Sequence, residues 1–370
     1  MTAAARDADE VSVDGASVHE VSVLDAAEAL AARDPSSFHT LLERLPDQAR
    51  EAWALGQSWP LPPGFRTPSR VVLLGVGGSA IGADMVATLA RLHGHAPVEV
   101  VRQYTPPATD AGALVIACSF SGNTEETVAA FESTLDTPGM RIAFTAGGRL
   151  AALARERRVP LLSYGWDGPP RTALGYGLFT VLGVLARLGA IDISDAEAGA
   201  AIGALRDAAE RYGLRAPKND AKRLAIAIGR RVPVIIGVDF LEVAARRFAT
   251  EISENAKQWA FSAALPEFNH NAMQAIAGPT GTPDTLTPII IDAPAVHPRN
   301  RRRVQETVRM MREAGVQPHV FDVGGDTPFD AIVRGATFAS WTSFYLAMLR
   351  GVDPTPTPVL DALKQRMAQP

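Results

Sequence analysis

The segment Arg70-Val-Val-Leu-Leu-Gly-Val-Gly-Gly-Ser-Ala-Ile-Gly82 (RVVLLGVGGSAIG) predicts the fold class of this chain. Its first part, Arg70–Leu74, is a short apolar run bounded by glycine, which is typical of a strand buried in a parallel sheet. Glycines dominate the next part, and apolar residues then recur at helical spacing from Ile81 to Leu92. A strand that passes through a glycine-rich turn into a helix opens a βαβ unit.

The same alternation continues along the chain on the C-terminal side of this segment. Strands are predicted at Val98–Val101, Ala113–Ala117 and Arg141–Phe144, and each is followed by a loop and a helix. Strands that alternate with helices in this way form a doubly wound parallel sheet.

The pattern then occurs a second time. Three pairs of segments match in the same order, which indicates two tandem α/β domains. The pairs are Val71–Gly75 with Val232–Gly237, Phe144–Gly148 with Phe321–Gly325, and Leu185–Asp192 with Leu346–Asp353. The halves are not equivalent, because Gly77-Gly78-Ser79 in the first corresponds to Asp239-Phe240-Leu241 in the second. We therefore expect only the first half to keep a loop suited to phosphate.

These signals predict five segments along the chain. An N-terminal helical extension (1–65) precedes a first α/β domain with the phosphate site (66–192). A linker or helix (193–220) leads to a second α/β domain (221–353), and a C-terminal helix (354–370) follows.

Composition excludes several classes of protein. The chain has 370 residues, of which 47% are hydrophobic and 21% charged, and this profile is typical of a globular protein. Its net charge of −4 argues against a nucleic-acid-binding protein. The single cysteine, Cys118, rules out an internal disulfide, and acidic residues stand near the start where a signal peptide would be basic and then apolar. We expect a cytoplasmic protein that binds neither nucleic acid nor membrane.

Two loops of the first half have the chemistry of a phosphate site. In Gly75–Gly82, glycines let the backbone approach an anion at the positive end of the following helix. In Ser119–Thr124 (SFSGNT), three hydroxyls stand on a turn that opens the helix Glu125–Phe131. The candidate phosphate ligands are Gly78, Ser79, Ser119, Ser121 and Thr124.

Both loops allow another interpretation. SFSGNT is also typical of an ordinary capped loop, because Ser, Asn and Thr are favoured at helix starts. Gly75-x-Gly77-x-x-Ala80 also fits a dinucleotide-binding fingerprint, with Glu99 as the acid for the ribose, so an NAD-dependent dehydrogenase stays open.

Histidines and arginines outside these loops give no sign of a metal or nucleic-acid site. His93 and His95 form the only close histidine pair, and no cysteine or acidic cluster completes a ligand set, so we expect no metal. The arginine-rich cluster Arg299–Arg303 is interpreted as the solvated face of a helix.

Six segments in order resemble the bifunctional phosphoglucose/phosphomannose isomerase family of the sugar-isomerase (SIS) superfamily. They are GVGGSAIG, SFSGNTEET, GPPRTALGYG, ENAK, PEFNHN and DPTP…LDALK, and they extend from about Arg70 to Lys364. The resemblance implies two tandem SIS-type domains. It also implies an isomerase that interconverts glucose-6-phosphate, mannose-6-phosphate or both with fructose-6-phosphate by ring opening and a cis-enediol(ate) proton transfer, without metal or cofactor.

The resemblance implies a role for five further residues. Glu254 is the base that carries a proton between C1 and C2, and Arg171 stabilises the enediolate. His270 opens the sugar ring from a neighbouring subunit, so a homodimer is implied. Lys364 assists ring opening, and Thr357 contacts the substrate where the family accepts the C2 epimer. The alternative is a non-catalytic protein that binds a sugar phosphate, which would need neither Glu254 nor His270.

Overall fold

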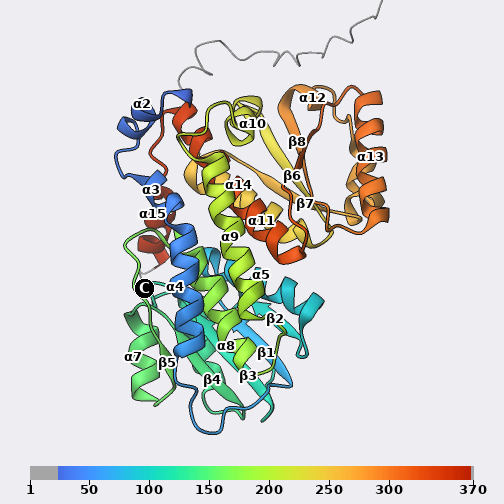
Figure 1. The fold of residues 1–370 in the computed structure, drawn as a ribbon. Helices are drawn as coiled ribbons and strands as arrows, with labels where there is room; N and C mark the ends of the chain where they lie inside the picture. The colour runs from blue at the N-terminus through green and yellow to red at the C-terminus, as the bar shows by residue number, and fades with distance from the viewer. Residues whose placement is uncertain (1–23, 368–370) are drawn as a thin grey trace, which may run out of the picture.

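The computed structural model describes residues 24–367 (Figure 1). The outermost parts of the predicted N-terminal extension and of the predicted C-terminal segment, residues 1–23 and 368–370, lie outside the described residues.

The described chain forms two separate parallel sheets, one in each half (Figure 1). The first sheet has the order β2-β1-β3-β4-β5 and the second has the order β7-β6-β8-β9, with every neighbouring pair parallel. The strands are β1 Arg70–Leu74, β2 Val98–Val101, β3 Ala113–Cys118, β4 Met140–Phe144, β5 Leu161–Leu162, β6 Val232–Val238, β7 Phe261–Leu265, β8 Leu286–Asp292 and β9 His319–Asp322. The predicted α/β class with two tandem parallel sheets is confirmed.

Helices cover both sheets and connect the halves. Those before the second sheet are α2 Ala27–Ala32, α3 Phe38–Glu43, α4 Leu45–Ser58, α5 Gly77–His93, α6 Glu125–Thr134, α7 Gly148–Glu156, η1 Pro170–Thr172, η2 Tyr176–Thr180, α8 Val181–Arg187, α9 Asp195–Tyr212 and α10 Asp220–Ile228. The later ones are η3 Asp239–Leu241, α11 Glu242–Asn255, η4 Glu267–His270, η5 Ala272–Ala275, α12 Thr282–Thr285, α13 Pro298–Glu313, α14 Pro328–Arg350 and α15 Pro358–Met367.

The internal repeat extends to backbone geometry. Gly77 follows β1 with a φ of +59°, and Asp239 follows β6 with the same φ of +59°. These two residues are as far apart in sequence as Gly75 and Gly237, so they are equivalent positions of the two halves. Glycine adopts a positive φ without a steric penalty, and aspartate is one of the few other residues that tolerate it. The turn is therefore shared, but only the first half presents glycine amides there.

Helix α14 is the central element of the second half. It is buried along nearly its whole length and packs against α9, α10 and α11. A helix that is apolar on all sides is stable only inside a core. Two of its few polar side chains, Ser340 and Ser343, hydrogen-bond to residues of α11.

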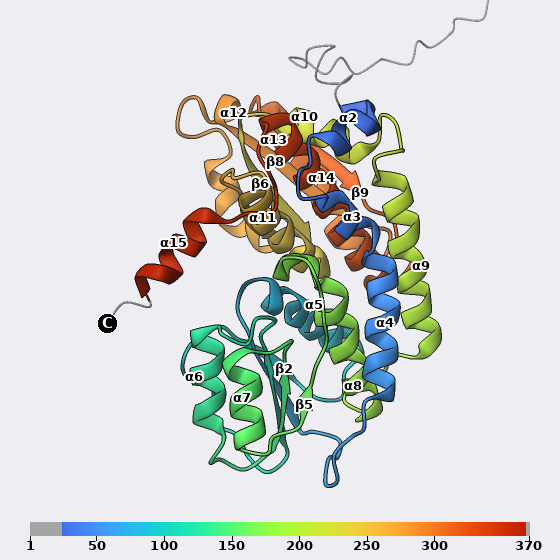
Figure 2. The same ribbon diagram turned by 90° about the vertical axis from the view of Figure 1, so that its left-hand side faces the viewer.

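The N-terminal helices hold the segment that carries Arg171. Helix α4 packs along η2, α8 and α9, and Figure 2 shows it beside α9. From α4, the Gln48 amide donates to the Thr172 carbonyl oxygen at 3.0 Å and accepts from the Gly175 backbone N–H at 2.6 Å. Part of the predicted 193–220 linker is α9, which packs on both α4 and α14. The division of the chain into five segments stays a prediction.

Within residues 24–367, no helix has the length and apolarity that crossing a membrane requires.

A close approach between α5 and η2 provides a test of this packing. A Cβ at Gly82 would lie 2.7 Å from the carbonyl carbon of Gly177, a backbone atom that cannot move aside. Gly82→Ala should therefore lower the free energy of unfolding by about 1–3 kcal/mol, measured by urea denaturation.

Gly199→Ala is the matched control. Gly199 is an exposed helical glycine with no atom within 4 Å of a built Cβ. Because alanine favours a helix over glycine, this variant should gain about 0.5–1 kcal/mol. A Gly82→Ala protein as stable as Gly199→Ala would contradict the packing described here.

Candidate active site

The glycine-rich loop after β1 lies directly against η1. A Cβ built at Gly78 would lie 2.9 Å from the backbone nitrogen of Arg171 and 3.0 Å from its Cα. Only glycine allows this approach, so Gly78 brings the N-terminal end of α5 next to Arg171. The positive end of that helix therefore lies next to the backbone from which the Arg171 side chain extends.

The predicted hydroxyls gather at the same place. Ser79 Oγ accepts a hydrogen bond from the backbone N–H of Phe120 at 3.3 Å, which joins the two predicted loops. Ser119 Oγ and Thr124 Oγ1 lie 2.9 Å apart, and Ser121 Oγ accepts from the Asn123 N–H at 3.2 Å. Ser119 is buried and braces the loop, whereas Ser121 is exposed.

A third loop, which belongs to the repeated segment Phe144–Gly148, supports the hydroxyl loop. Gly122 has a φ of +68°, and a Cβ there would lie only 1.8 Å from the Gly147 carbonyl oxygen. The Asn123 side chain accepts from the backbone N–H of Arg149 at 3.0 Å. These contacts fix the orientation of the Ser121 turn.

Arg171 is buried where three distant segments meet. Its Nε donates to the Asn255 side chain at 2.7 Å, and its Nη1 lies 3.4 Å from Glu254 Oε2, both at the end of α11. Its Nη2 donates to the carbonyl oxygens of Pro354 and Thr355 at 2.5 and 2.9 Å. Burial lowers the pKa of Arg171, and the charge of Glu254 opposes that shift. An arginine stays protonated in this setting.

A count of donors shows what the guanidinium can still bind. Of its five N–H groups, one meets Asn255, two meet the Pro354 and Thr355 carbonyls, and one meets Glu254. Among the described residues, one Nη1 N–H has no acceptor. That donor lies beside the half-buried carboxylate of Glu254, whose side chain is 28% exposed.

A buried ion pair supports Arg171 from behind. Arg247 Nη2 and Glu251 Oε1 lie 2.6 Å apart, with 3% and 2% of their side chains exposed. Ser340 of α14 donates to Glu251, and Arg247 also donates to the Arg171 carbonyl oxygen at 3.3 Å. Burial raises the pKa of the Glu251 carboxyl, and Arg247 opposes this shift. Removing either charge would leave the other buried without a partner, which is strongly destabilising.

Lys257 and Asn255 are site residues to which no role was assigned from sequence. Lys257 has a φ of +54°, and its Nζ donates to the carbonyl oxygens of Glu254 at 2.5 Å and Pro354 at 3.2 Å. Burial lowers the pKa of Lys257, and the charge of Arg171 lowers it further. A non-glycine residue in this conformation is strained, and such strain persists where surrounding contacts enforce it. Their position in the ENAK segment, next to Glu254, was the sequence signal that could have identified both as site residues.

His270 does not join this cluster within one chain. It is exposed at the end of η4, which packs on β7 and η5. Within residues 24–367, no hydrogen bond or ion pair links it to Arg171 or Glu254.

Thr357 and Lys364 both lie in the C-terminal segment, but only Thr357 is close in sequence to a residue that Arg171 binds. Thr357 is half-buried, two residues beyond the Thr355 carbonyl that Arg171 binds. Lys364 stands on α15, a helix without buried residues, and its side chain is 77% exposed. Its Nζ lies 3.7 Å from Asp361 on the same helix. The structure therefore does not bring Lys364 to the Arg171 cluster.

In the described part of the chain, no three His, Cys, Asp or Glu side chains gather as metal ligands would.

Comparison with known proteins decides the family. The chain is 32% identical over 331 residues to the bifunctional phosphoglucose/phosphomannose isomerase of Caldicellulosiruptor bescii, covering 88% of this chain and 97% of the relative. The chain belongs to the bifunctional phosphoglucose/phosphomannose isomerase family. Residues 217–367 match the family model of the bacterial phospho-glucose isomerase C-terminal SIS domain. The predicted recognition of this isomerase family is confirmed, and with it the prediction of an enzyme.

Other similar proteins include a second isomerase of the same name and a sugar-phosphate epimerase. The enzyme of the same name from Aquifex aeolicus is 29% identical, covering 80% of this chain and 90% of the relative. A D-glucosamine-6-phosphate 4-epimerase of Sulfolobus acidocaldarius is 30% identical, covering 62% of this chain and 70% of the relative. Neither a non-catalytic sugar-phosphate-binding protein nor an NAD-dependent dehydrogenase is favoured by these matches.

Solved structures support the fold. A hypothetical protein of Thermus thermophilus superposes with a TM-score of 0.74 at 17% identity, covering 95% of this chain and 96% of that one. Glucosamine-6-phosphate deaminase of Thermotoga maritima superposes with a TM-score of 0.65 at 15% identity, covering 86% and 97%.

The buried ion pair behind Arg171 yields a stability prediction. Glu251→Gln removes the charge that balances Arg247 in a dry setting, so the free energy of unfolding should fall by about 3–5 kcal/mol, measured by urea denaturation.

Glu242→Gln on the same helix is the control. Glu242 pairs with Arg246 at 3.0 Å, but both side chains are nearly half exposed. Water screens such a pair, so the loss should stay within about 0.5 kcal/mol. Equal losses from the two variants would mean that the Arg247–Glu251 pair does not brace Arg171.

Proposed function

We propose that this protein interconverts glucose-6-phosphate, mannose-6-phosphate or both with fructose-6-phosphate. The observation that carries the proposal is the contact between the glycine-rich loop and the backbone of Arg171, whose side chain pairs with Glu254. Gly78 lies against Arg171, whose Nη1 lies 3.4 Å from the Glu254 carboxylate. A phosphate on the loop then anchors one end of a sugar while its other end reaches the carboxylate.

Each reaction requirement has a candidate group in this cluster. Ser79, Ser121 and Thr124, with the amide of Gly78, are proposed to bind the phosphate, and buried Ser119 holds Thr124. Glu254 takes the proton from C2 of the open-chain aldose and returns it to C1. The free Nη1 N–H of Arg171 stabilises the charge that develops on the enediolate oxygens.

Glucose and mannose phosphates differ only at C2 and lose that centre in the enediolate. Because both epimers pass through the same intermediate, one carboxylate serves both if it reaches either face of C2. Thr357, close to the Thr355 carbonyl that Arg171 binds, is the proposed contact to the C2 hydroxyl. Neither a metal nor a redox cofactor is required for this proton transfer.

A homodimer with His270 contributed across the interface completes the proposal. The His270 side chain is exposed, and no hydrogen bond or ion pair among residues 24–367 joins it to Glu254 of its own chain. Just before it, Trp259 and Phe261 stack at 5.8 Å with 74% and 52% of their surface exposed, on or beside the edge strand β7. Exposed aromatic side chains at an open sheet edge are typical of a contact surface. Lys364 on the exposed helix α15 assists ring opening in the same assembly.

A cytoplasmic location is part of the proposal. The one cysteine of the chain, Cys118, is a buried free thiol, and burial raises its pKa to about 12. Such a thiol stays protonated and unreactive, which suits a reducing compartment.

Replacing the proposed base tests the chemistry. Glu254→Gln keeps the shape of the side chain but cannot take a proton, so kcat should fall by about 10²–10⁴ while sugar phosphate still binds. With the native protein, deuterium at C2 of either aldose phosphate should be found partly at C1 of fructose-6-phosphate, measured by NMR. Glu242→Gln, an exposed change on the same helix, should keep normal turnover.

The label also separates the proposal from a 4-epimerase. Glucosamine-6-phosphate is assayed beside the two hexose phosphates, because one relative is named for acting on it. Epimerisation at C4 leaves a C2 label in place. If only glucosamine-6-phosphate is turned over and its C2 label is retained, the proposed isomerisation is contradicted and 4-epimerisation is indicated.

Complementation tests the contribution across the interface. Glu254→Gln and His270→Asn proteins are expressed together with two different tags, and the heterodimer is isolated through both. Each homodimer should be nearly inactive. The heterodimer should regain activity, because one of its two sites then combines an intact Glu254 with the partner subunit's His270. A heterodimer as inactive as its parents would show that both residues serve the same chain.

A further inference from the structure

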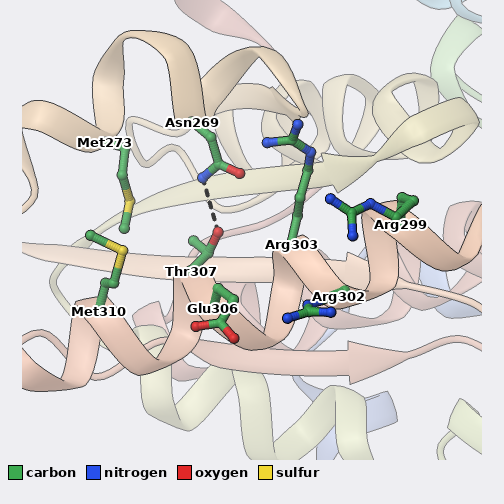
Figure 3. Close-up of a pocket in the computed structure, with 8 residues that line it drawn as sticks. All are labelled: Asn269, Met273, Arg299, Arg302, Arg303, Glu306, Thr307 and Met310. Atoms are coloured by element: carbon green, nitrogen blue, oxygen red, sulfur yellow. Dashed lines mark hydrogen bonds between the residues drawn. The ribbon is translucent and has the colours of Figure 1, made fainter.

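A surface cavity, separate from the Arg171 cluster, lies between α13 and the segment 266–275, which carries His270. It has a volume of about 320 Å³, and Figure 3 shows the residues around it. Helix α13 supplies Arg299, Arg303 and Met310 on one face, because these positions recur at helical spacing. This volume is at the lower end of the range for pockets that hold small organic ligands. We name it the α13 cavity.

One end of the α13 cavity is strongly basic. Arg299, Arg302 and Arg303 line it, and Figure 3 shows the Arg303 guanidinium toward Asn269 and the Arg302 guanidinium beside Glu306. Within residues 24–367 none of the three side chains has a carboxylate partner. Glu306 also lines the cavity, but its carboxylate pairs with Arg309 at 2.6 Å, and Asp292 and Asp322 each lie 3.5 Å from Arg301. Arg299 and Arg302 are exposed, as predicted for a solvated face, and three arginines without a carboxylate partner border the same cavity.

The other end of the α13 cavity is apolar. Met273 of η5 and Met310 of α13 face one another there (Figure 3). Met310 is 49% exposed although it is a large apolar residue. Arg303 and Met310 are about 10 Å apart along the axis, from the helical rise of 1.5 Å per residue. A basic end and a thioether end thus stand at a separation that one elongated ligand spans.

We propose that the α13 cavity binds a nucleoside diphosphate, with its phosphates on Arg299, Arg302 and Arg303 and its base between Met273 and Met310. Guanidiniums bind phosphate oxygens through paired, charge-assisted hydrogen bonds. Methionine sulfur packs favourably against aromatic rings and adapts to their shape. A compact inorganic anion would use the basic end and leave the methionines uncovered.

The bound nucleotide also acts on the His270 segment. Asn269 lines the cavity and donates to Thr307 Oγ1 of α13 at 2.9 Å, and His270 is the next residue. A ligand held by both η5 and α13 fastens this segment to the helix. The regulatory consequence rests on the proposed function, in which His270 opens the sugar ring.

Direct binding to the full chain without hexose phosphate tests the site independently of any activity. ADP, pyrophosphate and adenosine are titrated separately by calorimetry at fixed salt concentration. ADP should bind at least about tenfold more tightly than either fragment, because only ADP uses both ends. Arg302→Gln/Arg303→Gln should weaken ADP binding at least about tenfold. Arg312→Gln, a charge change on the same helix outside the cavity, should leave it unchanged.

Two further measurements separate this site from the catalytic one. Ser121→Ala/Thr124→Ala in the proposed phosphate loop should keep ADP binding. ADP should slow amide hydrogen exchange in residues 266–275 and change kcat/KM for hexose phosphate in the native protein but not in the double arginine variant. Absence of ADP binding, or its loss in the Ser121/Thr124 variant, would overturn the site. Equal affinity for pyrophosphate and ADP would overturn the nucleoside part, and binding without effect on exchange or turnover would overturn the regulation.

Discussion

A buried guanidinium is the constraint around which this molecule is arranged. Arg171 has almost no contact with water, so four of its five N–H groups meet acceptors within the protein. The acceptors come from the end of α11 and from the carbonyls of Pro354 and Thr355, which follow α14. Both belong to the second half, whereas Arg171 lies in the first. The hydrogen bonds of this one guanidinium therefore link the two halves of the chain, beside the glycine-rich loop Gly75–Gly82.

The two halves share a turn but divide the chemistry. After the first strand of each sheet, the chain passes through a residue with a φ of +59°. In the first half this residue is Gly77, and free amides and hydroxyls follow. In the second half it is Asp239, whose carboxylate accepts from Asn300 of α13 at 3.2 Å. A carboxylate there repels an anion, so the second half contributes Glu254, Lys257 and the buried Arg247–Glu251 pair instead.

Local signals explain which elements were predicted correctly. The strands at Arg70–Leu74 and Val232–Val238 are apolar runs next to glycine, and such runs are buried on both faces of a parallel sheet. The edge strand Phe261–Leu265 escaped prediction because its first residues are exposed and it lacks a continuous apolar run. The arginines of α13 were predicted to be a solvated face, and Arg299 and Arg302 are exposed; sequence does not reveal that they border the same cavity as Met273 of η5.

The sequence by itself determined the α/β class, the repeat and the family, because each depends on residues close together in the chain or on ordered motifs. Only the tertiary structure decided which functional groups meet. Arg171 and Glu254 are 83 positions apart, and their contact depends on how η1 and α11 pack. Lys364, from the same set of motifs, remains exposed on α15 instead. Contacts between distant side chains follow from the packing of whole helices, and no local pattern in the chain encodes that packing.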